Sequence, residues 1–148
     1  MTPVAAVANP NETSLKGPTI LLIEDYSDTR EMISTLLRRR GYDVIEAKDG
    51  IEGLLKASCL NPDLILMDLA LPEMDGVEVT RRIHSMPKLA EIPIIVLSAY
   101  LNEAVERDVL AAGCVEIFPK PFDASSFLEC IQVTLDKRKR EPVKIWCD

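Results

Sequence analysis

The sequence predicts an α/β protein in which helices cover both faces of a doubly wound parallel sheet of five strands. Five short apolar runs alternate with segments of helical periodicity from Thr19 onward, and this alternation is typical of consecutive β-α units. Polar side chains follow four of the runs directly or within two residues. Right-handed crossovers between parallel strands place the connecting helices on both faces of such a sheet.

The apolar runs give the expected strands, and proline, glycine and asparagine give their limits. Asn61-Pro62 ends the segment before the third run, and Pro93 opens the fourth. The strands are therefore expected at 19–23, 42–46, 63–67, 93–97 and 115–118.

The first two helices are predicted from cap signals and apolar stripes. In each, an aspartate is followed three residues later by a glutamate, as in an N-cap with its N3 partner: Asp28 with Glu31, and Asp49 with Glu52. The stripes expected to face the sheet are Met32, Ile33, Leu36 and Leu37 in the first helix, and Ile51, Leu54 and Leu55 in the second. We expect the first helix at about 28–40 and the second from Asp49 to about Ser58.

Three further helices follow the third, fourth and fifth strands. The first of them runs from about Gly76 to Ser85, after a loop that contains Pro72 and Asp75-Gly76. The next covers 102–112 and is closed by Gly113. The last covers about 123–137 and carries a stripe of Phe127, Ile131 and Leu135.

Length and composition predict one folded domain. The chain has 148 residues, of which 47% are hydrophobic and 28% charged, enough for one core. Residues 1–17 lack a sustained period and are expected to form a flexible N-terminal arm. The folded domain is expected at 18–138, and 139–148 is a short tail with little room for an output domain.

Several classes of protein are disfavoured by the same composition. No apolar run approaches the roughly 18 residues that span a bilayer, so we expect no membrane association. The four cysteines have no C-x-x-C spacing, which favours a reduced, cytoplasmic protein. A net charge of −7 argues against direct binding of nucleic acid, so the expected partners are proteins.

The polar residues that follow the apolar runs should gather at one edge of the sheet. Ligands of open α/β sheets bind outside the carboxyl ends of the strands. A cation site, a nucleophile and two donors for an anion would meet there, a combination suited to moving a phosphoryl group onto Asp68. The five residues are Glu24, Asp25, Asp68, Ser98 and Lys120.

Four motifs carry a resemblance to a known family. In their order and spacing they resemble the receiver domain of two-component response regulators, over about residues 19–137. The motifs are Leu-Leu-Ile-Glu24-Asp25, Asp63-Leu-Ile-Leu-Met-Asp68, Ile-Pro-Ile-Ile-Val-Leu-Ser98-Ala99 and Phe-Pro-Lys120-Pro121-Phe. The resemblance implies a flavodoxin-like sheet of strand order 2-1-3-4-5, with Asp68 accepting a phosphoryl group from a histidine of a partner.

Mg²⁺ is the cofactor that this chemistry needs, because it offsets the repulsion between carboxylate and phosphate. Asp25 and Asp68 are the expected direct ligands and Glu24 acts through a water, while the family pattern adds the backbone carbonyl of Ala70. Lys120 is expected to pair with Asp68 and then with the phosphoryl oxygens, to one of which Ser98 donates. The resemblance also implies a cis bond between Lys120 and Pro121.

The expected function is that of a stand-alone response regulator rather than an enzyme. The partner that supplies the phosphoryl group is a histidine kinase or a histidine phosphotransfer protein, and the output is a changed affinity for a downstream protein. The sequence names neither partner.

Other interpretations remain open at this stage. Glu24 or Asp25 alone would more often be a helix cap, and Ser98 or Lys120 alone an ordinary loop residue. An aspartate-nucleophile phosphohydrolase needs a second acid two residues after the nucleophile, where this chain has Ala70. A receiver fold that docks without phosphorylation is disfavoured because all five expected residue types are present.

One position departs from the family pattern. Receivers commonly carry tyrosine or phenylalanine three residues before the lysine, and this chain has Ile117 there. Phe118 should face the opposite side of its strand and so cannot substitute for it. Tyr100, in the loop after Ser98, is the expected moving aromatic.

Overall fold

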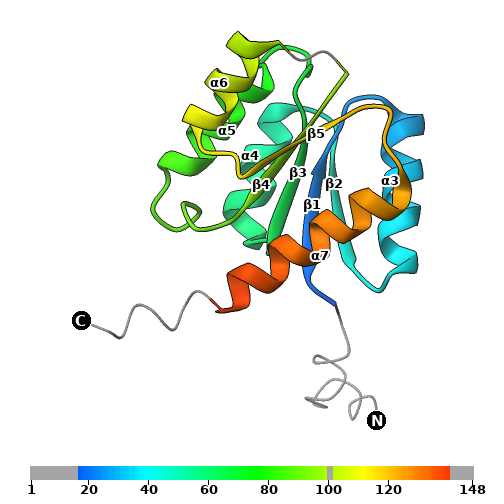
Figure 1. Cartoon of the computed structure of the whole chain (residues 1–148). Helices are drawn as coiled ribbons and strands as arrows, with labels where there is room; N and C mark the ends of the chain where they lie inside the picture. The colour runs from blue at the N-terminus through cyan, green and yellow to red at the C-terminus, as the bar shows by residue number, and fades with distance from the viewer. Residues whose placement is uncertain (1–16, 100–101, 141–148) are drawn as a thin grey trace.

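A computed structural model describes residues 17–99 and 102–140, with the side chains of 139 and 140 excepted. Five parallel strands form one sheet of order β2-β1-β3-β4-β5 (Figure 1), which confirms the predicted doubly wound, flavodoxin-like fold. The strands are β1 Thr19–Ile23, β2 Asp43–Ala47, β3 Leu64–Asp68, β4 Ile94–Ser98 and β5 Glu116–Pro119. The helices are α3 Ser27–Arg39, α4 Gly50–Leu60, α5 Gly76–Ser85, α6 Glu103–Ala112 and α7 Ala124–Arg140.

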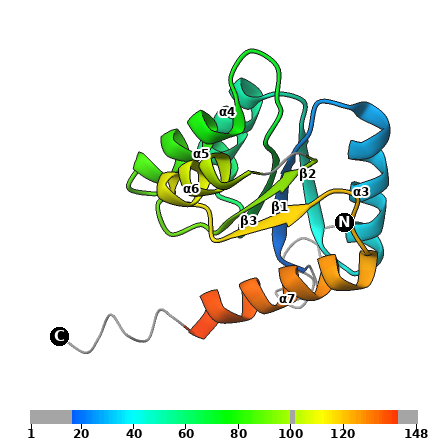
Figure 2. The same cartoon turned by 45° about the horizontal axis from the view of Figure 1, so that its top comes forward.

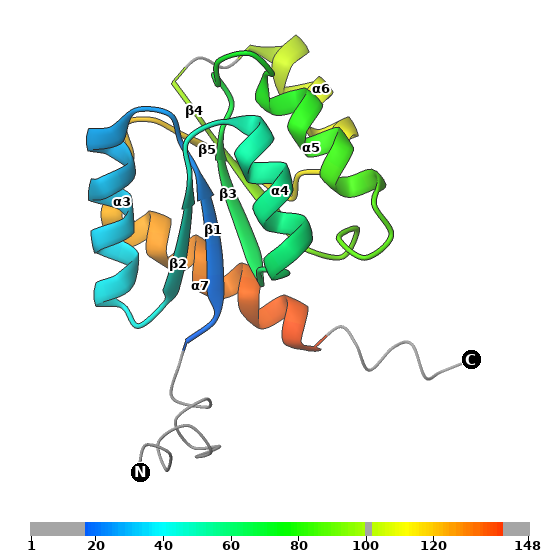
Figure 3. The ribbon, with the colours of Figure 1, turned by 180° about the vertical axis from the view of Figure 1, so that it is seen from behind.

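Helices cover the two faces of the sheet unequally. α3 and α7 lie on one face, and α4, α5 and α6 lie on the other (Figures 2 and 3). Side chains alternate between these faces along each strand, as the strand period requires. In β1, Leu22 belongs to the core under α3 and α7, while Leu21 and Ile23 belong to the core under the other three helices.

The register of the central strands positions the ends of the apolar runs. Ile23 pairs with Met67, so Glu24, which follows β1, lies at the same level as Asp68, the last residue of β3. The same reasoning applies across β4 and β5, where Ser98 pairs with Pro119 immediately before Lys120. A slip of one residue would move every side chain of a strand to the other face, so the buried core holds the polar residues in place.

The start of α3 differs from the sequence prediction. The Asp49 side chain accepts a hydrogen bond from the Glu52 amide at 2.8 Å, which confirms the cap of α4. The predicted cap at Asp28 is wrong: α3 follows Tyr26 and has no side-chain cap bond. The Tyr26 amide donates instead to Glu24 Oε2 at 3.2 Å. This bond fixes the loop, so Asp28 lies in the first turn, where the helix dipole favours its charge.

The predicted apolar stripes are only partly correct. Ile33 and Leu37 are buried in α3, but Met32 is exposed. In α4 the expected Leu54 packs against the core, but Ile51 and Leu55 are exposed. The buried residues of α4 are the small ones, Gly50, Gly53 and Ala57. A side chain at Gly53 would place its Cβ 2.5 Å from Cδ1 of Ile23. α4 therefore lies too close to the sheet for large side chains at its inner positions.

Gly76 makes a similar close approach next to Asp68. Its amide donates to the Leu69 carbonyl at 2.9 Å, and a Cβ would lie 2.8 Å from the Leu69 Cα and 3.0 Å from the Asp68 carbonyl oxygen. Because these are backbone atoms, they cannot move aside as a flexible side chain can.

Gly76→Ala is therefore expected to lower the free energy of unfolding by about 1–3 kcal/mol, the usual range for overpacking. Urea denaturation measures this change. Gly41→Ala is the control for backbone strain alone, because Gly41 has a φ of 92° with no atom within 4 Å of a built Cβ; it should cost about 1 kcal/mol. A Gly76→Ala protein as stable as the wild type would contradict the tight contact.

Candidate functional site

Three carboxylates converge at the carboxyl ends of β1 and β3. One oxygen from each of Glu24, Asp25 and Asp68 lies within 4.8 Å of the others. Glu24 is 1% exposed and Asp68 7% exposed, whereas Asp25 is exposed. The structure therefore brings together the three acids that the strand-end pattern predicted, two of them buried and one reachable from solvent.

Lys120 supplies the positive charge of the site. Its Nζ lies 3.2 Å from Glu24 Oε1 and 3.6 Å from Asp68 Oδ1. The Lys120 amide donates to the Ser98 carbonyl at 2.8 Å, and the peptide bond to Pro121 is cis. One ammonium thus contacts both buried acids, from a backbone that is bonded to the next strand.

The hydrogen bonds that the described residues make to the Asp68 side chain use only one of its two carboxylate oxygens. The Ala70 amide donates to Asp68 Oδ1 at 3.2 Å, and the Ala70 side chain is exposed. The Leu69 amide donates to the Leu97 carbonyl at 2.9 Å. Within the described residues, Asp68 Oδ1 holds the contacts to Lys120 and Ala70, and Oδ2 accepts no hydrogen bond.

Ser98 lies at the carboxyl end of β4 with its side chain buried. Its carbonyl binds the Lys120 amide, so it belongs to the same edge as the acids. The predicted contact of its hydroxyl with a phosphoryl group remains a prediction. Tyr100, the expected moving aromatic, lies outside the described residues.

The electrostatics of the site leave an excess of negative charge. Burial raises the pKa of Glu24 above its ordinary 4.5, and the Asp68 charge raises it further. Lys120 and the Tyr26 amide lower it only in part. A cation bound by these carboxylates would offset that repulsion. The side chains of the cluster offer only oxygen ligands, which suits Mg²⁺.

Arg30 is a residue of the site that sequence reasoning missed. Its Nη1 donates to the Glu24 carbonyl at 2.8 Å and to the Asp25 carbonyl at 3.4 Å, while its Nε binds Glu46 Oε1 at 3.3 Å. The available signal was its position in the first turn of a helix, where the dipole disfavours a cation. A basic side chain there needs acceptors, and it finds them in the backbone of the two acids.

The departure at Ile117 has a clear structural counterpart. Ile117 packs against the core under α4, α5 and α6, and Phe118 against the core on the opposite face, as predicted. The Phe118 ring stacks with Phe122 and Phe127, with centroids 5.8 and 5.5 Å away. These rings flank the segment that carries Lys120, so the aromatic residues near β5 support the lysine loop and are not placed on the face of Ile117.

Comparison with known proteins decides the family. The model of the response regulator receiver domain matches residues 20–132. The chain belongs to this family. Members of the family are generally signalling switches rather than enzymes, and the acidic pocket of Glu24, Asp25 and Asp68 is typical of regulators that accept a phosphoryl group. No helix in the described ranges combines the length and apolar character needed to cross a bilayer.

Two curated relatives illustrate the range of the family. The polar-differentiation response regulator DivK of Brucella ovis is 33% identical over 113 residues, which cover 76% of this chain and 92% of DivK. The DNA-binding dual master transcriptional regulator RpaA of Synechocystis sp. is 35% identical over 125 residues, or 84% of this chain. The match covers 52% of RpaA, so the receiver spans about half the length of that relative.

Solved structures show the same fold. The receiver domain of the sensor histidine kinase PA1611 of Pseudomonas aeruginosa is 33% identical, with a TM-score of 0.76 over 81% of this chain and 98% of that one. That structure has a magnesium ion coordinated in its active-site cleft. A CheY-like receiver domain protein of Methanospirillum hungatei has a TM-score of 0.80 at 27% identity, over 84% of this receiver and 98% of its own chain.

Arg30→Ala is expected to weaken Mg²⁺ binding by about 10-fold or more, the usual effect of losing a group that orients metal ligands. Titration calorimetry measures the affinity. Arg38→Ala is the matched control, because Arg38 also pairs with Glu46, at 3.3 Å, but donates to the Val44 carbonyl and not to the acids. Equal Mg²⁺ affinities for the two variants would show that Arg30 does not position the site.

The raised pKa of Glu24 predicts a pH dependence for the metal-free protein. Ionisation of Glu24 opposes folding. The free energy of unfolding therefore decreases as pH rises from 4.5, the ordinary pKa, through the raised pKa of the folded protein. Glu24→Gln cannot ionise, and its stability relative to wild type should increase over that interval, measured by urea denaturation with a chelator present.

Glu52→Gln provides a control of opposite sign. The Lys48 amide and then Lys56 lower the pKa of Glu52, so the ionised carboxylate favours folding. The free energy of unfolding of Glu52→Gln relative to wild type should therefore decrease as pH rises. Parallel pH profiles for the two variants would contradict the assignment of a raised pKa to Glu24.

Proposed function

We propose that this receiver accepts a phosphoryl group on Asp68 from a histidine of a kinase or phosphotransfer protein, and thereby changes its affinity for a downstream protein. The observation that carries the proposal is the environment of Asp68. This buried carboxylate lies near two other acids and 3.6 Å from the Lys120 ammonium. A buried acid cluster of this kind is unfavourable for folding alone, which supports a functional reason for it.

The metal site follows from the same residues. Asp25, Asp68 and the Ala70 carbonyl are the proposed direct ligands of Mg²⁺, with Glu24 acting through a water. The ion supplies positive charge between carboxylate and phosphate when it is bound. Support comes from the oxygen-only ligand set and from the repulsion that raises the pKa of Glu24. The magnesium-bound receiver of PA1611 gives independent support.

Transfer needs little rearrangement of the protein. An Asp68 oxygen forms a bond to phosphorus as the bond from phosphorus to the histidine nitrogen breaks, and the nitrogen keeps the electron pair. Lys120 then turns from Asp68 to a phosphoryl oxygen, and the Ser98 hydroxyl donates to another. Both residues already lie at this edge through the bond from the Lys120 amide to the Ser98 carbonyl.

The output is proposed to use the segment from 98 to 103 and the neighbouring helix α6. Ile117 takes the place of the usual aromatic and is partly buried, so a large ring cannot move inward at that position. The segment that follows Ser98 is then proposed to respond to the phosphoryl group. The change at this surface would alter binding of a protein target.

Two other functions are weaker. A phosphohydrolase of the aspartate-nucleophile class needs an acid at position 70, where the structure has an exposed methyl group. A docking module that works without phosphorylation needs no acid cluster, and it would not need a lysine bonded to two buried acids. Incorporation of a phosphoryl group separates the switch from the docking module.

Asp68→Asn should abolish incorporation of acid-labile label from acetyl phosphate in the presence of Mg²⁺. Asparagine keeps the shape of the side chain but loses the nucleophile, so the circular dichroism spectrum should not change. Asp63→Asn is the control, because Asp63 lies before β3 and accepts from the Thr19 amide, away from the site. Label that survives in Asp68→Asn, or that is absent from the wild type, would overturn the proposal.

A further inference from the structure

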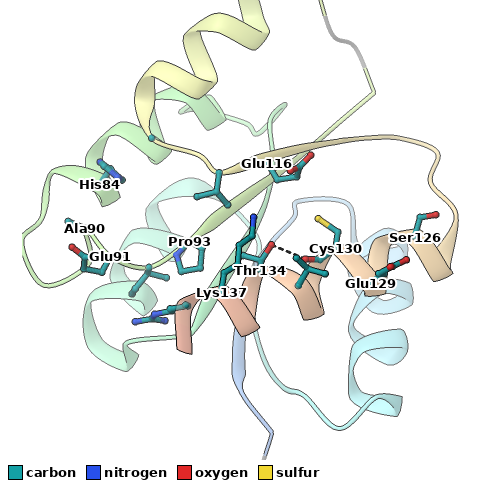
Figure 4. A pocket seen from close by; sticks show the side chains of 15 residues that line it. His84, Ala90, Glu91, Pro93, Glu116, Ser126, Glu129, Cys130, Thr134 and Lys137 are labelled. Atoms are coloured by element: carbon teal, nitrogen blue, oxygen red, sulfur yellow. Dashed lines mark hydrogen bonds between the residues drawn. The ribbon is translucent and has the colours of Figure 1, made fainter. Parts of the chain in front are cut away.

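A groove lies at the opposite end of the sheet from the acid cluster. It has a volume of about 1000 Å³ and is bounded by α7, by the beginnings of β4 and β5, and by the segment before β4. Figure 4 shows Pro93 and Glu116 on one side and Cys130, Thr134 and Lys137 of α7 on the other. Because Pro93 and Glu116 stand at the amino ends of their strands, the groove is separate from the site of Asp68.

Exposed apolar side chains lie among charged ones in the lining of this groove. Val115 is 51% exposed and Val133 is 44% exposed, and both line it together with Cys130. Acidic side chains surround them, Glu91 before β4, Glu116 on β5 and Glu129 on α7. Lys137 and Arg138 of α7 also line the groove, so charges of both signs border its apolar side chains. The groove therefore suits an extended segment that carries apolar side chains.

The chain itself supplies such a segment directly after α7. Glu141-Pro142-Val143-Lys144-Ile145-Trp146-Cys147-Asp148 follows Arg140, and the groove includes Lys137 and Arg138 of the last turn. Pro142 has no backbone N–H and so cannot donate the hydrogen bond that would continue α7. In an extended segment, Val143, Ile145 and Cys147 point to one side, which gives an apolar edge.

We propose that residues 142–148 bind this groove as an extended segment running antiparallel to α7. The lengths agree. The five residue-to-residue steps from Pro142 to Cys147 span about 16 Å in an extended chain, and α7 covers the same length in about 11 residues. Counted back from Arg140, this distance ends beside Cys130. Ile145 then lies next to Val133.

This arrangement gives the segment a defined role. It covers the exposed apolar surface of α7 and β5, and a protein that binds the same surface must first displace it. The segment then acts as a competitor built into the chain, with an effective concentration set by a short connection.

Trp146 is the single tryptophan of the chain, so time-resolved fluorescence anisotropy of the native protein reports on this segment alone. The indole is expected to tumble with the domain. Val133→Glu, which places a charge in the groove at an exposed position, should add a large fast component of local motion. Leu55→Glu, at an exposed apolar residue of α4 outside the groove, should not.

Disulfide trapping tests the register. Oxidation with diamide, which takes up the two electrons and two protons released, should join Cys147 to Cys130 and not to exposed Cys59. Mildly alkaline solution is needed because burial raises the pKa of Cys130. The yield of this disulfide, measured by mass spectrometry, should fall several-fold in Val133→Glu and stay unchanged in Leu55→Glu.

Three results would overturn the proposal. The first is fast local motion of Trp146 in the wild type, which would leave the groove open to another protein. The second is a slow component that depends on protein concentration, which would place the segment of a second copy in the groove. The third is equal disulfide yield in Val133→Glu and the wild type.

Discussion

The contact of one ammonium with two buried carboxylates is the constraint on which the arrangement of this edge depends. Lys120 lies 3.2 Å from Glu24 and 3.6 Å from Asp68. Each buried charge carries a desolvation cost of several kcal/mol, which only close pairing and hydrogen bonds offset. The ends of β1, β3 and β5 must therefore meet at one level, and the parallel register provides this.

One positive charge among three acids leaves the site with uncompensated negative charge, which a bound cation can offset. The raised pKa of Glu24 shows that Lys120 does not fully offset burial and the charge of Asp68. A bound cation completes the balance, and a phosphoryl group brings new negative charge that both cation and Lys120 can bind. Arg30 contributes differently, because it holds the carbonyls of Glu24 and Asp25 and thereby fixes where their side chains start.

The sequence could predict the parts of the fold that depend on local patterns. Apolar runs and their polar ends located the strands, and with them the three acids and Lys120. The stripe of α4 was right at Leu54 but wrong at Ile51 and Leu55, because hydrophobicity does not report size: the contact with Ile23 needs Gly53, and Ile51 and Leu55 are exposed. Arg30 was missed because its partners within the site are the backbone carbonyls of Glu24 and Asp25, which leave no pattern in side-chain type.

The short strand β5 runs between the acid cluster and the groove. Lys120 follows it at the acid cluster, and Val115 precedes it at the groove. As an edge strand of four residues it pairs only with β4, so it has fewer neighbours to resist a shift than the central strands. Any such shift would couple the two ends, and coupling is reciprocal. Suppose that a segment bound in the groove favours one position of β5 and thereby changes the free energy of phosphorylation. Phosphorylation must then change the free energy of binding of that segment by the same amount.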